Sequence, residues 1–168
     1  RGILKFAKDE KSVKEDSDLH EVVRRVAGII GQYVPAENLW LDLDLAASLP
    51  PVSINATEIE QVLVNLIKNA VEASEDEVRV VIRTESDGEE VVVVVEDNGP
   101  GMSPETLRQI FDPFFSTKPV GMGTGLGLFI VHEIVGQHGG TVTVDSPPGH
   151  GALFKVYIPD SKQMESAQ

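Results

Sequence analysis

The chain has no cysteine, little aromatic content and few basic residues relative to acidic ones. The lack of cysteine excludes disulfides, thiolate metal sites and cysteine nucleophiles. The 14 Lys and Arg residues against 27 Asp and Glu residues give a net charge of −13, whereas nucleic acids and anionic membranes bind basic patches. No apolar run approaches the roughly 18 residues of a membrane span. We therefore expect no nucleic-acid partner and no membrane contact by this chain.

The remaining composition is that of one folded domain. The 168 residues are 41 % hydrophobic, which is enough for a core, and they begin at Arg1, so we expect a piece of a longer protein. Strands and helices follow one another without regular alternation. This order predicts an α+β fold, a two-layer α/β sandwich with a mixed sheet of about five strands and about three helices on one face. Strands are expected at 38–45, 78–84, 90–96, 141–145 and 153–158, helices at 18–31, 58–74 and 126–137, a short helix from Ser103, a charged connector at 9–18 and a loose tail at 161–168.

The helix expected at 58–74 carries amide side chains beside its apolar face. Asn65 and Asn69 lie one turn apart, although asparagine is a poor helix former. On the solvent edge of the helix they would have no function. Facing a cleft, their oxygens would suit Mg²⁺, which commonly bridges a protein to phosphates. The helix alone leaves both interpretations open.

The segment "EDNGPGM", residues 96–102, directly follows a strand of consecutive valines. A carboxylate at the end of a buried strand, followed by Gly-Pro-Gly, brings backbone close to another group. The alternative is an ordinary β-turn that Asp97 caps, because Asp-Asn-Gly is common turn chemistry.

The segment "GMGTGLGL", residues 121–128, leads into a helix. Its alternating glycines allow backbone N–H groups to approach an anion at a helix N-terminus, although the two familiar glycine-rich phosphate motifs are absent. The alternatives are a flexible hinge, or a lid that serves as both hinge and phosphate-binding loop. The preceding "FDPFFSTK", 111–118, holds three phenylalanines that form either a satellite core or the anchor of a lid. Lys118 is a candidate phosphate contact there, or a solvated lysine.

In this order, "NLIKNAVEA", "DNGPGM", "FDPFFSTK" and "GTGLGL" resemble the N, G1, F and G2 boxes of bacterial two-component sensor histidine kinases. The resemblance is to their catalytic ATP-binding (HATPase_c) domain, in the GHKL superfamily with the Bergerat fold that also includes gyrase B, MutL and the large ATP-driven heat-shock chaperone. It spans about residues 18–159, and is greatest for the nitrogen-regulation and C4-dicarboxylate class. The implied organisation is the end of a dimerisation-domain helix and a linker at 1–17, the ATP-binding domain at 18–160 and a tail at 161–168.

The resemblance implies roles for individual residues, with ATP and Mg²⁺ as the bound groups. Asn69 would coordinate Mg²⁺ bridging the triphosphate, Asn65 would lie near the phosphates, and Asp97 would accept the adenine amino group. Lys118 would reach the terminal phosphates from the lid. Ala152 stands where family members often have threonine, so a water-mediated adenine contact is expected to be absent. The other nucleotide contacts are expected from Lys68, Gly99, Gly101, Met102, Gly123, Thr124, Gly125, Leu126, Gly127 and Leu128, with Phe111, Phe114 and Phe115 fixing the lid.

Position 65 distinguishes branches of the superfamily. Its ATP-hydrolysing members have a glutamate four residues before the metal asparagine, which activates water, and Asn65 has no useful basicity. The resemblance therefore implies a phosphoryl donor that acts on a histidine of a separate dimerisation domain and, through it, on a response-regulator receiver domain. A hydrolase and a regulatory module that binds nucleotide without catalysis are the alternatives.

The phosphoacceptor histidine is expected to be absent from this chain. His20-Glu21 and His132-Glu133 imitate an acceptor pair, but both fall outside the dimerisation helix, so we interpret all four histidines as core or surface residues. A cytoplasmic location is expected, whether or not the parent protein is anchored in a membrane.

Overall fold

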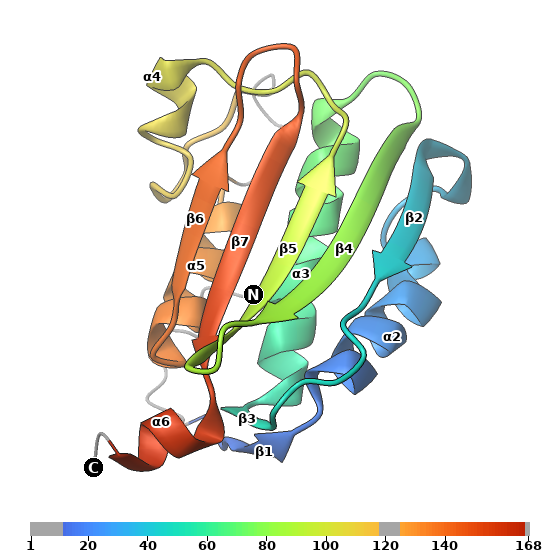
Figure 1. Cartoon of the computed structure of the whole chain (residues 1–168). Helices are drawn as coiled ribbons and strands as arrows, with labels where there is room; N and C mark the ends of the chain where they lie inside the picture. Colours follow the sequence, from blue (N-terminus) through green and yellow to red (C-terminus); the bar gives the residue numbers. More distant parts are fainter. Residues whose placement is uncertain (1–11, 118–124, 167–168) are drawn as a thin grey trace.

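A five-stranded mixed sheet covered by helices on one face forms the domain (Figure 1). The structure is a computed structural model that describes residues 12–117 and 125–166. The strand order is β2-β4-β5-β7-β6, with β2 and β4 parallel and the other pairs antiparallel. This confirms the predicted α+β sandwich. The strands are β2 (Leu39–Asp44), β4 (Val78–Ser86), β5 (Glu90–Asp97), β6 (Thr141–Asp145) and β7 (Ala152–Pro159), and the covering helices are α2 (Leu19–Ile29), α3 (Ala56–Ala73) and α5 (Gly127–Gln137).

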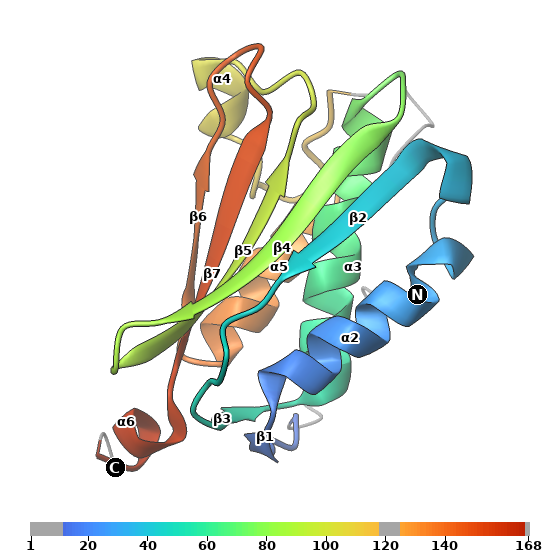
Figure 2. The same ribbon diagram turned by 45° about the vertical axis from the view of Figure 1, so that its right-hand side comes forward.

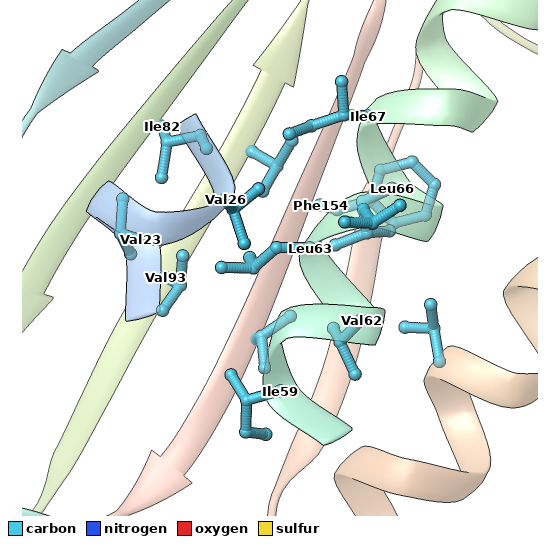
Figure 3. Packing of buried hydrophobic residues seen from close by; sticks show 14 of the residues in the cluster. Val23, Val26, Ile59, Val62, Leu63, Leu66, Ile67, Ile82, Val93 and Phe154 are labelled. Carbon is cyan, nitrogen blue, oxygen red and sulfur yellow. The ribbon is translucent and has the colours of Figure 1, made fainter. Parts of the chain in front are cut away.

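The core lies between the sheet and α3. The apolar side chains of α3 recur at helical spacing and point toward the sheet and α2, where Leu63, Val26 and Val93 belong to one buried cluster (Figure 3). The central strand β5 is buried on both faces, since Val94 as well as Val93 is almost fully covered. This accounts for its unbroken valine run, which differs from the alternation of a half-buried strand.

The start of α3 is capped by Asn55, the residue before its first turn. The Asn55 side chain accepts a hydrogen bond of 3.1 Å from the Glu58 backbone N–H. The Glu58 carboxylate accepts a hydrogen bond from the Ser12 hydroxyl, which connects α3 to the N-terminal segment. The helix therefore begins at Ala56, two residues before the expected start at Glu58.

Two segments are more ordered than their sequences predict. Within the expected connector, β1 (Glu15–Ser17) pairs with β3 (Val52–Ile54), and within the expected tail, residues Ser161–Ser166 form α6. The Ser161 hydroxyl donates to Asp16 over 2.7 Å and its N–H donates to Pro51 over 3.2 Å. Thus β1, β3 and α6 lie together at one end of the domain (Figure 2). Strands of three residues carry no periodic signal, so they depend on partners distant in sequence.

His138 connects the end of α5 to the start of α3. The side chain is 1 % exposed, its Nε2 accepts from the Asn55 N–H over 3.1 Å, and its Nδ1–H donates to the Ile134 carbonyl over 2.8 Å. This arrangement requires the neutral imidazole. Burial lowers the pKa of His138 below 6.5; the Ile134 hydrogen bond opposes this, Lys14 adds to it and Glu58 opposes it.

We expect His138 to make the domain less stable in acid. Because its folded-state pKa is lowered, the unfolded chain binds a proton that the folded chain excludes, so stability is complete above the ordinary pKa of 6.5 and declines as the pH falls below it. His138→Ala should cost about 2 kcal/mol at neutral pH by leaving the Asn55 N–H without its acceptor. It should also flatten the pH dependence. Urea unfolding at several pH values measures both, with the exposed His132→Ala on the same helix as control; an unchanged pH dependence in His138→Ala would contradict the prediction.

Candidate functional site

A cleft of about 700 Å³ opens beyond the end of β5, between α3 and α4 (Pro104–Leu107). This volume is within the usual range of small-molecule sites. In Figure 1 the end of β5, the end of α3 and α4 all lie toward the upper end of the domain. The cleft is the place where the four sequence motifs meet. The predicted site residues that line it are Asn65, Lys68, Asn69, Asp97, Gly101, Met102, Gly125, Gly127 and Leu128.

The other predicted site residues lie beside the cleft or outside the described residues. Gly99 adjoins Asp97, and Leu126 is the N-cap residue of α5. Lys118, Gly123 and Thr124 fall outside the described residues.

The amides of α3 face this cleft rather than the solvent edge of the helix. Asn65, Lys68 and Asn69 are each partly buried and line the cleft. The Asn65 Nδ2 donates to the Gly127 carbonyl over 3.2 Å, so this side chain also holds the start of α5 against α3. Asn69 presents a neutral, hard oxygen donor, which fits an Mg²⁺ ion whose other ligands are phosphate and water oxygens.

Asp97 is the last residue of β5 and lies at the other end of the cleft. Its Oδ1 accepts the Gly99 N–H over 2.8 Å. Burial raises the pKa of Asp97 above its usual 3.8, the Gly99 and Ala152 N–H groups oppose this, and Glu96 adds to it. Asp97 therefore both caps the turn that follows β5 and lines the cleft. The carboxylate is held in place by backbone and can accept a donor from a ligand.

The Gly-Pro-Gly loop after Asp97 is held by the turn between β6 and β7. The Gly149 N–H donates to the Pro100 carbonyl over 2.6 Å, and the Met102 N–H donates to Ser146 over 3.4 Å. Gly101 has a φ of 76°, and a Cβ there would collide with the Pro147 backbone. Glycine is required at this position by both conformation and space.

The three phenylalanines of the "FDPFFSTK" segment have different roles. Phe111 and Phe115 pack against the core, and the Phe111 ring lies edge-on to Phe154 at 6.5 Å. The Phe114 side chain is 69 % exposed, and its backbone has a φ of 66°. The Phe114 N–H donates to the Gly125 carbonyl over 2.9 Å, which joins the two flanks of residues 115–124. Phe111 and Phe115 therefore belong to the margin of the main core rather than to a satellite core, and Phe114 contributes a backbone contact.

The histidines occupy structural positions. The His20 ring is buried, with its Nε2 2.8 Å from the Thr84 hydroxyl. His132 lies on the surface with its ring 5.4 Å from that of Phe111. His138 is buried and His150 is exposed. These positions agree with our interpretation of them as core and surface residues.

Ser74, Thr106 and Ile110 also line the cleft, although the sequence did not predict them there. Serine at a helix end and threonine in a first turn are common for capping alone, and an isolated isoleucine indicates a core position. No pattern in the sequence marks them for a ligand.

Comparison with known proteins decides the family. A model of the histidine kinase-, DNA gyrase B-, and HSP90-like ATPases matches residues 54–162, most of the chain. The chain belongs to this ATPase family. The matched range includes all four motifs and every cleft residue named above. ATP is therefore the nucleotide that this family membership supports.

Relatives within this ATPase family are sensor kinases. The chain is 40 % identical over 153 residues to the sensor histidine kinase ZraS of Klebsiella oxytoca, covering 90 % of this chain and 32 % of ZraS. It is 34 % identical over 174 residues to the sensor kinase CckA of Brucella abortus, covering 95 % of this chain and 18 % of CckA. The chain thus spans about a third or less of the length of these relatives.

The solved structures that resemble this chain also include histidine kinases. The catalytic domain of histidine kinase ThkA superposes with a TM-score of 0.76 at 32 % identity, covering 88 % of this chain and 95 % of that domain. Full-length ShkA in complex with AMPPNP gives a TM-score of 0.80 at 28 % identity, covering 94 % of this chain and 34 % of ShkA. Within the family, the chain is a histidine kinase catalytic domain, as the four motifs predicted.

Proposed function

We propose that this domain binds Mg·ATP and donates the γ-phosphoryl group to a histidine on a separate dimerisation domain. The observation that carries the proposal is that Asn65, Asn69 and Asp97 line one cleft. Asp97 lies at one end, near the end of α3, and Asn65 with Gly127 lies at the other. This arrangement favours the base at Asp97 and the phosphates at the N-terminus of α5, where the helix dipole attracts anions.

The phosphate end lacks a side chain suited to activate water at position 65, because an amide has no useful basicity. Glu72 and Glu75 also line the cleft, but Glu72 lies two turns along α3, on the order of 10 Å from Asn65 by helix rise. The chain's own residues would act by positioning: Asn69 would hold the metal, while Lys68 and the first N–H groups of α5 would orient the phosphates. Mg²⁺, when bound, would supply charge neutralisation. Lys118, Gly123 and Thr124 are proposed to complete the phosphate contacts.

The partners are proposed from the comparisons. ThkA has been solved in complex with the response regulator protein TrrA, at a TM-score of 0.77 to this chain and 27 % identity. We extend this to a receiver domain as the second partner here, after the dimerisation domain. The nitrogen-regulation class, the domain boundaries and a cytoplasmic location are also proposals. Neither 12–117 nor 125–166 contains a helix long and apolar enough to cross a membrane.

Phosphotransfer from labelled ATP to a separately made dimerisation domain tests this function. We expect label on the acceptor histidine in the presence of Mg²⁺, and none on a dimerisation domain whose acceptor histidine is replaced by glutamine. Steady phosphate release without any acceptor would indicate a hydrolase instead. Normal ATP binding without transfer to a cognate dimerisation domain would indicate a regulatory module.

A further inference from the structure

Ser74 and Asp97 present two side-chain oxygens to the same small space in the cleft. Ser74 follows the last residue of α3, and both side chains line the cleft. A methyl group placed on Gly99 would stand 2.9 Å from Asp97 Oδ1 and 3.0 Å from Ser74 Oγ. The two oxygens therefore border the same space beside Gly99, although they come from different layers of the fold.

The end of α3 fixes the direction of the Ser74 hydroxyl. The Ser74 N–H donates to Val71 over 3.2 Å instead of to Ala70, so the Ala70 carbonyl is one of the acceptors left over at the helix end. The Ser74 hydroxyl donates to that carbonyl over 3.2 Å. With its proton directed there, the hydroxyl presents acceptor lone pairs to the cleft. A freely rotating serine would accept or donate, but this one is oriented as an acceptor.

Two acceptors that converge on one space match a ligand group with two N–H donors. We propose that Ser74 is a specificity-determining residue that accepts the second hydrogen of the exocyclic amino group of adenine, beside Asp97. The inference rests on the proposed function, which sets the base at the Asp97 end. A purine with an oxygen at that position would meet lone pairs on both sides, and a purine with hydrogen there would leave both acceptors without a donor.

The competing explanation is that Ser74 only ends the helix. Replacing it by alanine would then loosen the last turn of α3 and weaken every nucleotide equally. A ligand that lacks only the amino group separates the two explanations. Purine riboside triphosphate has hydrogen at that position and is otherwise identical to ATP, so its affinity is insensitive to a hydrogen bond made by the amino group.

The experiment measures dissociation constants of ATP and purine riboside triphosphate by calorimetry with saturating Mg²⁺. In Ser74→Ala we expect ATP to bind about 5-fold more weakly while purine riboside triphosphate is unchanged, since one neutral hydrogen bond contributes about 1 kcal/mol. Ser74→Thr keeps the hydroxyl and should retain the preference for ATP. Ser86→Ala, at the last residue of β4, controls for general effects of removing a serine hydroxyl.

Each result of this experiment either supports or contradicts the proposed role of Ser74. An equal loss for both nucleotides in Ser74→Ala would assign Ser74 to helix structure alone, and no loss for either would also overturn the inference. If the unaltered domain binds neither nucleotide, the proposed function itself fails. If the unaltered domain binds both with equal affinity, adenine recognition at Asp97 fails together with the role of Ser74.

Discussion

Replacement of Asn69 by alanine is expected to abolish Mg²⁺-dependent binding of ATP and phosphotransfer. Asn69 lines the cleft on α3 and presents the amide oxygen that would ligate the ion. Without it, the charge neutralisation that Mg²⁺ supplies is lost, which is worth several kcal/mol and lowers transfer at least about 100-fold. Calorimetry of ATP binding with Mg²⁺ and with EDTA measures the first effect, and labelled transfer to a dimerisation domain measures the second.

Gln61 provides a matched control for this substitution. It is an exposed amide two turns earlier on α3 and does not line the main cleft. Gln61→Ala should keep both the Mg²⁺ dependence of ATP binding and the rate of transfer. If Asn69→Ala behaves like Gln61→Ala, the assignment of the metal to Asn69 is wrong, whereas the fold is unaffected because Asn69 is not a core residue.

Replacement of Asp97 by asparagine is expected to weaken ATP binding while stabilising the unliganded domain. The carboxylate is a charged acceptor for the adenine amino group, and losing one charge-assisted hydrogen bond in a shielded cleft weakens binding about 30- to 100-fold. At the same time, asparagine removes a charge from a site where burial raises the pKa. The combination of greater stability and weaker binding cannot result from partial unfolding.

The pH dependence of this stability difference has a definite sign. Because the folded-state pKa of Asp97 is raised above 3.8, the unfolded chain loses the proton first as the pH rises, so ionisation of Asp97 costs stability. Asp97→Asn should therefore exceed the unaltered domain in free energy of unfolding at neutral pH. The difference should vanish below the ordinary aspartate pKa of 3.8. Chemical unfolding from acid to neutral pH measures it.

Asp87 is the control of opposite sign. It lies in the β4–β5 turn, where its Oδ1 accepts the N–H groups of Glu90 and Glu89, and these hydrogen bonds hold its pKa below the usual value. Asp87→Asn should not raise stability at neutral pH and should leave ATP binding unchanged. Equal affinity of the unaltered domain for ATP and GTP, or a normal ATP affinity in Asp97→Asn, would contradict the adenine assignment.

The sequence predicted the long helices and strands well but missed some of the short ones. Long periodic segments such as α3 and β5 appear in the structure close to their expected bounds, because their apolar spacing reflects the face that they bury. The β1–β3 pair and α6 were not predicted. Their short segments are ordered by contacts such as Ser161 with Asp16, which join opposite ends of the chain.

The sequence by itself determined the fold class, the helix with two amides and the carboxylate at the end of a buried strand. These features are local, since a side chain's face follows from the period of its own element. The tertiary structure alone decided that Asn65 and Asp97 share one cleft, that Asn65 holds Gly127, and that the Ser74 and Asp97 side chains border the same space beside Gly99. Such meetings depend on how α3 packs against the sheet and α5, and packing between elements is set by many buried side chains together rather than by any one motif.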